Sequence, residues 1–153
     1  MIASQAVTTA LLLAAGTGTR LRPVTANAPK CLTKVAGHSI LGRVVGNLRA
    51  AGFERLVVVI GYQGDRIREF LQHNASGLQI DYVYNPEYRT TNNIYSLWLA
   101  RQQIRESFLL VESDLVFDAS MLAGMLHPDK IAISKILPWM NGTTVSLDSA
   151  GRR

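Results

Sequence analysis

The sequence contains a single cysteine, Cys31, among its 153 residues. One cysteine excludes an internal disulfide framework and a cysteine-rich metal site, which fits a reducing cytosol and gives redox chemistry no support. Long apolar runs are also lacking. The run over residues 6–15 is too short to span a bilayer, and no Lys or Arg precedes it. We therefore predict a cytoplasmic protein with no membrane partner, and we interpret this run as a buried strand.

Basic residues outnumber acidic ones, but they are scattered along the chain. The formal net charge is +5, which suits a partner that carries phosphate. Nucleic acid is not the predicted partner, because the sequence has no helix-turn-helix signature, no pair of metal-finger cysteines and no aromatic RNA-binding motif. A small phosphorylated ligand accounts for the charge as well. A homo-oligomer stays an open alternative.

The composition, 48% hydrophobic and 18% charged, suits one sizeable core, so we predict a single domain over residues 1–153. Strand-length apolar stretches alternate with helical-period stretches, which is typical of an α/β fold. The prediction is a Rossmann-like, three-layer fold with a mostly parallel central sheet. Predicted strands span residues 7–13, 56–60, 78–84, 108–111, 131–133 and 143–147, with a turn at Asn141-Gly142. Predicted helices span residues 39–51, 65–73 and 121–126, with another capped by Asn92 or Asn93.

The most informative segment is the long loop that follows the first strand and reaches Lys30. A dinucleotide-binding fingerprint requires a third glycine where Leu21 stands, and a Walker loop requires glycine, lysine and serine or threonine in succession, so both interpretations fail. Around Gly16 and Gly18, small residues let backbone N–H groups approach a triphosphate, and Arg20 and Lys30 supply positive charge nearby. The alternative is an ordinary strand-to-helix turn with basic residues at the surface.

The extended pattern Gly-x-Gly-x-Arg-Leu-x-Pro-x-Thr followed by Pro-Lys-x-Leu resembles the signature of the sugar-nucleotidyltransferase superfamily. The matching positions are Gly16, Gly18, Arg20, Leu21, Pro23, Thr25, Pro29, Lys30 and Leu32. In that family an acceptor oxygen attacks the α-phosphorus of an NTP in line, and pyrophosphate leaves. The resemblance implies two catalytic residues: Arg20 holds the β- and γ-phosphates, and Lys30 bridges the α-phosphate and the acceptor. It also implies a nucleotide-binding segment made of Leu13, Ala14, Ala15, Gly16, Thr17, Gly18, Thr19 and Arg20.

Asp114 is the predicted Mg²⁺ ligand, because it follows a buried strand and is similar to the family's metal-binding acidic residue. Magnesium prefers hard oxygen ligands from carboxylates, phosphates and water. An aspartate that caps a turn is the alternative. Glu112 is expected to point to the other side of the strand. The family normally continues further and supplies a second acidic ligand; Asp118, Asp129 and Asp148 lie in no such segment, so we expect a truncated fold, a degenerate copy or a core completed by another subunit.

Two further blocks narrow the expected substrate. Residues 85–97 resemble the corresponding segment of cytidylyltransferases that act on phosphocholine or 2-aminoethylphosphonate, and residues 139–143 resemble a stretch of the aminoethylphosphonate type. The resemblance implies transfer of CMP from CTP, with Asn93, Ser96 and Trp139 binding the acceptor. Trp139 offers a face for an ammonium group or anchors a loop, whereas Trp98 is expected in the core. The alternatives are a sugar-1-phosphate nucleotidyltransferase using UTP or dTTP, a nucleotide-binding module without turnover, and a scaffold domain.

Overall fold

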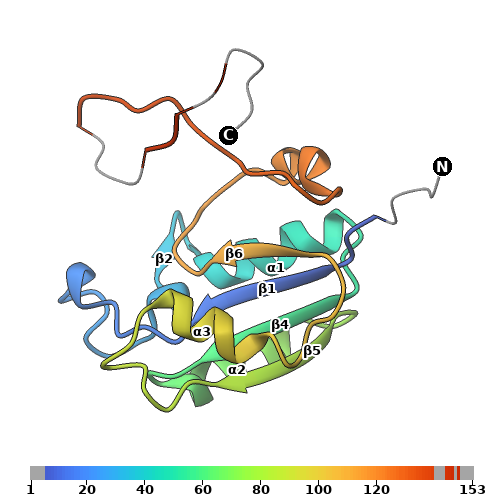
Figure 1. The fold of residues 1–153 in the computed structure, drawn as a ribbon. Coiled ribbons are helices and arrows are strands. Elements are labelled where there is room, and N and C mark those ends of the chain that lie inside the picture. The colour runs from blue at the N-terminus through green and yellow to red at the C-terminus, as the bar shows by residue number, and fades with distance from the viewer. Residues whose placement is uncertain (1–5, 140–143, 147, 149–153) are drawn as a thin grey trace.

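A four-stranded parallel sheet forms the centre of the molecule (Figure 1). The structure is a computed structural model, and it describes residues 6–139, 144–146 and 148. The strand order is β5-β4-β1-β6. These strands are β1 (Thr9–Ala14), β4 (Arg55–Ile60), β5 (Gln79–Tyr84) and β6 (Phe108–Glu112). The short strands β2 (Lys34–Val35) and β3 (His38–Ser39) form a separate antiparallel pair.

Helices cover both faces of the central sheet. They are α1 (Ile40–Ala50), α2 (Gly64–Asn74) and α3 (Asn93–Ala100), and 3₁₀ turns occur at Thr19–Leu21, Lys30–Leu32 and Ala119–Met125. Alternate β1 side chains enter two cores: Leu12 packs with α1 and α2, and Leu11 and Leu13 pack with α3. The α/β prediction with three layers is therefore confirmed. No helix in the described part of the chain is long and apolar enough to span a membrane.

Two short polar residues fix where the helices begin. Ser39 Oγ accepts a hydrogen bond from Gly42 N at 3.1 Å at the start of α1. Asn92 Oδ1 accepts one from Ile94 N at 3.1 Å at the start of α3. Each bond satisfies a backbone donor that has no partner within the helix. Asn92 is thus the cap, which leaves the side chain of Asn93 for other contacts.

The topology brings the carboxyl ends of β1 and β6 together. The chain leaves β1, passes through α1 and adds β4 on one side, whereas β6 joins β1 on the other. Leu13 of β1 is in register with both Val59 of β4 and Glu112 of β6. Open parallel sheets bind ligands at such a change of direction, outside the carboxyl ends of the strands. The loops after β1 and β6 therefore lie side by side at the carboxyl ends of the strands.

The two strands predicted over residues 131–133 and 143–147 are not found among the described residues, whereas the short helix predicted over residues 121–126 is present as the 3₁₀ turn Ala119–Met125. Residues 131–133 form no strand, and Ile131 and Ile133 are 65% and 52% exposed. Their apolar alternation predicts a strand only where a sheet edge pairs with it, and the central sheet ends at β6. Residues 144–146 also lack regular structure, and the predicted Asn141-Gly142 turn lies outside the described residues.

Trp98 is not a core residue. Its side chain is 49% exposed, and that of Ile94 on the same side of α3 is 74% exposed. The helix instead packs Leu97 and Ala100 against the sheet. Trp98 stacks on Tyr95 with a ring-centroid separation of 5.5 Å, and the Arg101 guanidinium lies 3.7 Å from its ring centre. Helical spacing correctly placed Ile94 and Trp98 on one face of α3, but it did not show that this face points to solvent.

Candidate active site

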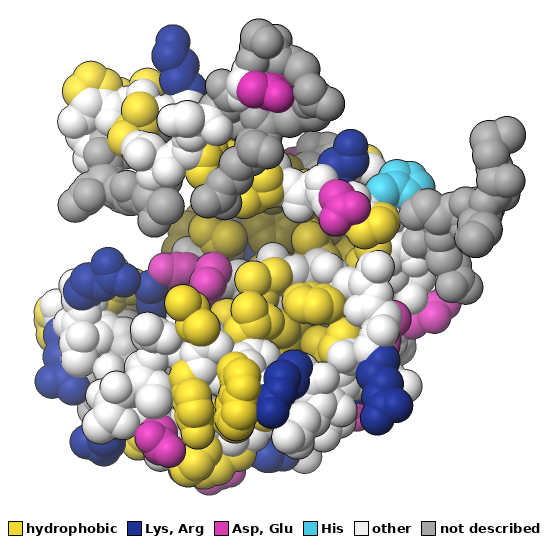
Figure 2. Space-filling model, viewed as in Figure 1, with side chains coloured by type: hydrophobic (Ala, Val, Ile, Leu, Met, Phe, Trp, Pro, Cys, Tyr) yellow, Lys and Arg dark blue, Asp and Glu magenta, His cyan; other side chains and the backbone are white. Residues whose placement is uncertain are grey.

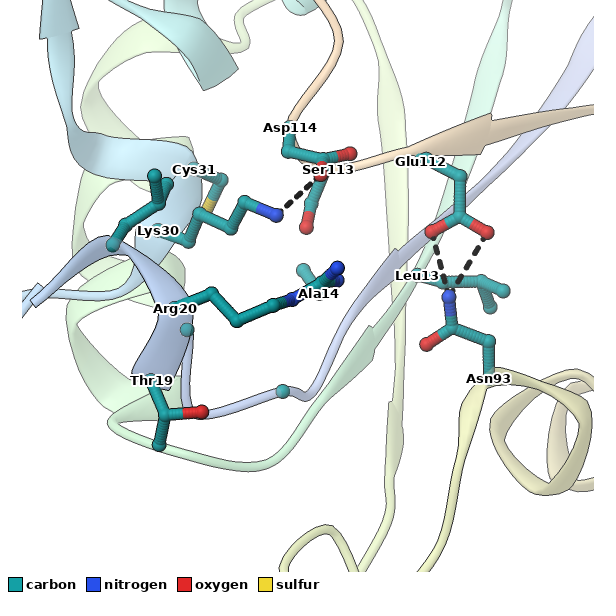
Figure 3. A pocket seen from close by; sticks show the side chains of 13 residues that line it. Leu13, Ala14, Thr19, Arg20, Lys30, Cys31, Asn93, Glu112, Ser113 and Asp114 are labelled. Atoms are coloured by element: carbon teal, nitrogen blue, oxygen red, sulfur yellow. Dashed lines mark hydrogen bonds and ion pairs between the residues drawn. The ribbon is translucent and has the colours of Figure 1, made fainter. Parts of the chain in front are cut away.

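A cavity opens at the carboxyl ends of β1 and β6 (Figure 3). It is bounded by the loop after β1, the start of α3 and the turn after β6. Its described lining residues are Leu13, Ala14, Gly16, Gly18, Thr19, Arg20, Leu21, Lys30, Cys31, Asn93, Glu112, Ser113 and Asp114. The side chains include two cations, two carboxylates and one amide. The cavity therefore has the polar character expected for a charged ligand.

Two glycines shape the loop that forms one wall. Gly18 has φ of +64°, a conformation that favours glycine, and an added Cβ would lie 3.2 Å from Thr25 Cγ2. Thr25, which is 1% exposed, donates through Oγ1 to Gly18 O at 2.7 Å. At Gly16 an added Cβ would meet nothing within 4 Å, so its missing side chain leaves open space beside the cavity. The backbone at Gly18 is thus packed against Thr25, whereas there is free space beside the backbone at Gly16.

Arg20 and Lys30 both reach the cavity from this loop. Arg20 lies in the 3₁₀ turn Thr19–Leu21, and its guanidinium points into the cavity (Figure 3). Lys30 opens the next 3₁₀ turn, and its Nζ forms an ion pair with Asp114 Oδ2. The structure therefore brings three of the predicted residues together: the two basic groups and the carboxylate assigned to a metal.

Glu112 also lines this cavity, so the expectation that it points away is wrong. Its Oε1 and Oε2 accept hydrogen bonds from Asn93 Nδ2 at 3.0 and 2.9 Å. Burial raises the pKa of Glu112, while the Asn93 hydrogen bond acts in the opposite direction. The strand period of two puts positions 112 and 114 on the same side of the chain, and that spacing was the signal that could have identified Glu112.

Several predicted site residues do not reach the cavity. Ala15 and Thr17 are absent from its described lining, although they alternate with residues that do line it. Ser96 is 3% exposed beneath α3, where its Oγ accepts from Asn85 Nδ2 at 3.1 Å. Trp139 is 78% exposed in the chain after the last 3₁₀ turn, also outside the described lining. Among the predicted acceptor residues, Asn93 alone borders the cavity.

The available oxygen ligands suit a metal that is shared with substrate. The side chain of Asp114 is 40% exposed, and Glu112 and Ser113 lie beside it in the same cavity. The described residues contain no group of three or more His, Cys, Asp or Glu side chains that could enclose a metal. Asp118 instead caps a 3₁₀ turn, accepting from Ser120 N at 2.9 Å. A divalent cation held by one or two carboxylates and by phosphate oxygens fits this arrangement.

Cys31 has no place in the chemistry of this cavity as a nucleophile. Burial raises the pKa of its thiol to about 12, so the sulfur stays protonated at neutral pH. The side chain is 2% exposed and packs in the core under α1. The charged and amide side chains are therefore the groups of this cavity that can contact a polar ligand.

The chain belongs to the MobA-like NTP transferase domain family, whose profile matches residues 10–134. It is 37% identical over 145 residues to CMP-5'-(3-aminopropyl)phosphonate synthase of Streptomyces rubellomurinus, which covers 93% of this chain and 23% of that protein. It is 31% identical over 108 residues to choline-phosphate cytidylyltransferase of Streptococcus pneumoniae, covering 71% of this chain and 45% of that protein. The predicted resemblance to nucleotidyltransferases is confirmed.

The fold is also similar to that of solved nucleotidyltransferases. The structure of an inositol-1-phosphate CTP transferase from T. maritima aligns with a TM-score of 0.68 at 30% identity, over 83% of this chain and 51% of that one. The CTP:phosphocholine cytidylyltransferase of Streptococcus pneumoniae aligns with a TM-score of 0.61 at 28% identity, over 71% and 45%. The chain thus spans about a quarter to a half of the length of these relatives.

Proposed function

We propose that this chain transfers CMP from CTP to a small amine-bearing phosphate or phosphonate and releases pyrophosphate. The observation that carries the proposal is that Arg20, Lys30 and Asp114 line the same cavity. Two cations and a carboxylate, drawn from loops far apart in the sequence, form a site for a polyphosphate and its counterion. The names of these relatives refer to CMP, CTP or cytidylyl transfer, which favours cytosine as the base. Two of them name an amine-bearing acceptor, aminopropylphosphonate or choline phosphate.

In the proposed reaction an oxygen of the acceptor phosphate or phosphonate forms a bond to the α-phosphorus of CTP. The bond from that phosphorus to the β-phosphate bridging oxygen breaks, and its electron pair leaves with pyrophosphate. The protein has to hold two anions together and to neutralise the charge that builds up. Lys30 would contact the α-phosphate and the acceptor, and Arg20 would bind the β- and γ-phosphates. The backbone of residues 14–16 would face the base and ribose.

Magnesium is the proposed cofactor, with Asp114 as its protein ligand and Glu112 as the nearest further carboxylate. When bound, Mg²⁺ supplies positive charge to the phosphate oxygens. A cytoplasmic location fits a reaction that consumes CTP, and it fits a buried cysteine that remains a free thiol. Neither basic residue has to move out of a packed core, because both already face the cavity.

A sugar-1-phosphate uridylyl transfer is the second candidate. It is favoured by a relative from Haloferax volcanii, a UTP–glucose-1-phosphate uridylyltransferase, with 36% identity over 112 residues, 73% of this chain and 45% of that protein. The two candidates differ in the base and in the acceptor. They share the cavity and its cations, so only a substrate comparison separates them.

The test measures pyrophosphate release by the 153-residue chain with Mg²⁺, each of CTP, UTP and dTTP, and an acceptor. The acceptors are 2-aminoethylphosphonate, phosphocholine and glucose 1-phosphate. Release with CTP and an amine-bearing acceptor supports the proposal, and release with UTP and glucose 1-phosphate supports the second candidate. Nucleotide binding without release under any pairing indicates a binding module.

Matched variants tie the activity to the cavity. Arg20→Ala and Lys30→Ala should each lower the rate by about a hundredfold, the effect of removing one charged transition-state contact. Arg22→Ala and Lys34→Ala remove exposed basic residues outside the cavity lining and should leave the rate unchanged. Equal losses in both pairs would contradict the assignment of these two residues.

A further inference from the structure

Glu112 and Asn93 together present hydrogen-bond acceptors to the cavity. The Asn93 amide nitrogen donates to both carboxylate oxygens of Glu112, at 3.0 and 2.9 Å. An amide has donors only on its nitrogen, so its oxygen Oδ1 stays free as an acceptor. A carboxylate has about four lone-pair positions, and the amide uses two of them. The pair therefore offers oxygen lone pairs from two side chains, in the region where Figure 3 shows them meeting.

The carboxylate of Glu112 has a neutral partner. Among the described residues the ion pairs of the chain are Lys30 with Asp114 and Arg55 with Asp81 and Glu106, and none includes Glu112. Glu112 is half-buried in the cavity lining, and removing a carboxylate from water costs free energy. A ligand cation placed beside it would offset that cost. The site is consequently suited to a positive group on the substrate.

The pair lies on the other side of the cavity from the basic residues (Figure 3). Glu112 and Asp114 are two residues apart, so their Cα atoms are separated by at most about 7 Å. Lys30 and Asp114 mark the phosphate end of the cavity, with Arg20 beside them, and Glu112 and Asn93 lie on the opposite side (Figure 3). A short aminoalkyl phosphonate carries an anionic group at one end and a cation at the other, so it can present one charge to each side.

The chemistry of the pair separates two kinds of ammonium. A primary ammonium has three N–H donors, which match the carboxylate and amide oxygens. A quaternary ammonium has no donor and is recognised by aromatic faces. The described lining of this cavity contains no Phe, Tyr or Trp, and Trp139 is exposed elsewhere.

We infer that Glu112 and Asn93 bind the primary ammonium of an aminoalkyl phosphonate or phosphate and select it over a quaternary ammonium. This inference rests on the proposed function, because it assigns acceptor specificity to the same cavity. Glu112 acts through a charge-assisted hydrogen bond, and the Asn93 oxygen accepts a second hydrogen bond from the same group. The selected substrate class is a zwitterion whose two charges face the two sides of the cavity.

The test compares two probes that differ only at nitrogen. Calorimetry measures the binding of 2-aminoethylphosphonate and of its N,N,N-trimethyl derivative, with Mg²⁺ and a non-hydrolysable α,β-methylene analogue of CTP present. Wild-type protein should bind the primary amine at least about tenfold more tightly, which corresponds to ~1.4 kcal/mol. Glu112→Gln should remove that preference by weakening the primary amine alone. Glu54→Gln, at an exposed carboxylate outside the cavity, should retain it.

Several outcomes would overturn the inference. They are equal affinity for the two probes in the wild type, no binding of either probe, and an equal loss of both in Glu112→Gln. A higher Mg²⁺ requirement for every acceptor in that variant would make Glu112 a metal ligand instead. Asn93→Ala, at an exposed position, gives a second variant and should weaken the primary amine severalfold.

The two proposals fail in different ways. If the protein still prefers the primary ammonium probe but releases no pyrophosphate, the proposed function is wrong and the inference about Glu112 and Asn93 is retained. If pyrophosphate release is equally efficient with both phosphonates, the proposed function is supported and the inference about ammonium selection is wrong.

Discussion

Lys30 and Asp114, 84 residues apart in the sequence, form an ion pair in the lining of the cavity. Each is the side chain assigned to a different ligand, Lys30 to phosphate and Asp114 to a metal. Their side chains are 22% and 40% exposed, and pairs open to solvent contribute only about 0–1 kcal/mol. Ligands can therefore replace this contact at small cost. The pair also couples the two ligands, because whatever binds one charge releases the other.

That coupling gives the first prediction. Lys30→Ala should weaken CTP binding by about tenfold, the loss of one charge-assisted contact. The same change should tighten Mn²⁺ binding in the absence of nucleotide, because the competing ammonium is gone from Asp114. Calorimetric titrations with each ligand measure both effects, and Lys34→Ala is the control. Tighter metal binding in the control, or weaker metal binding in Lys30→Ala, would contradict the coupling.

The second prediction concerns Gly61, which follows β4. An added Cβ there would lie 2.6 Å from Tyr88 Cβ and 2.8 Å from Ala15 O, so a side chain and the backbone after β1 would both have to move. Gly61→Ala should lower the free energy of unfolding by about 1–3 kcal/mol and should weaken CTP binding as well. Gly46→Ala, inside α1 with nothing within 4 Å, should raise stability by up to ~1 kcal/mol. Urea denaturation of both variants tests the contrast; similar values would refute it.

The third prediction is a pH dependence that belongs to Glu106. Its carboxylate accepts hydrogen bonds from Thr9 Oγ1 at 2.8 Å and from Arg55 Nη1 at 2.9 Å. The Thr9 hydrogen bond is the largest cause that lowers the pKa of Glu106 from 4.5 to about 2. The folded state therefore gains stability from this carboxylate above pH 4.5, and it loses that gain as the pH falls towards 2.

Unfolding free energies between pH 7 and pH 2.5 measure this contribution. Glu106→Gln should show a smaller decline with acid than the wild type, and Glu54→Gln should follow the wild type. The difference should be modest because Glu106 is exposed to solvent. An identical acid decline in the wild type and Glu106→Gln would show that these hydrogen bonds have no effect on stability.

The fourth prediction concerns the buried amide of Asn85, which is 1% exposed. Its Nδ2 donates to Ser96 Oγ and Thr91 Oγ1 at 3.1 and 3.2 Å, and its Oδ1 accepts from Glu87 N at 2.9 Å. Asn85→Ala should cost about 1–3 kcal/mol of stability, because buried polar groups lose their partners. Thermal and urea unfolding measure this cost. Asn74→Ala removes an exposed amide and should cost much less; a similar cost in both would contradict the role of burial.

The sequence predicts most of the sheet and its helices, because the hydrophobic patterns of β1, β4, α1 and α2 agree with their burial. The position of β1 between β4 and β6 does not follow from those patterns, since pairing depends on contacts distant in sequence. The apolar alternation at residues 131–133 failed for the same reason: no described strand pairs with it.

The cavity could be predicted in part. The loop pattern identified Arg20 and Lys30, and the strand before Asp114 identified that carboxylate; all three line the cavity, although their assigned roles stay predictions. Glu112 was missed because its side chain was expected to point to the other side of the strand, whereas it lines the cavity. Ser96 was assigned to the acceptor from its motif alone, whereas the structure buries it, and its Oγ accepts a hydrogen bond from Asn85 Nδ2. Motifs name residue types, and packing decides which of them reach a ligand.

The central place of β1 has a consequence for synthesis on the ribosome. β1 precedes the other described strands in the sequence, and its partners begin at Arg55 and end at Glu112. β1 can pair with β4 once residue 60 has left the exit tunnel, but it gains its second partner only after residue 112 has followed. A nascent chain that ends before β6 leaves one edge of this apolar strand unpaired, and such edges favour chaperone binding and mispairing with other chains. The strand at the centre of the finished sheet is thus incompletely paired until late in synthesis.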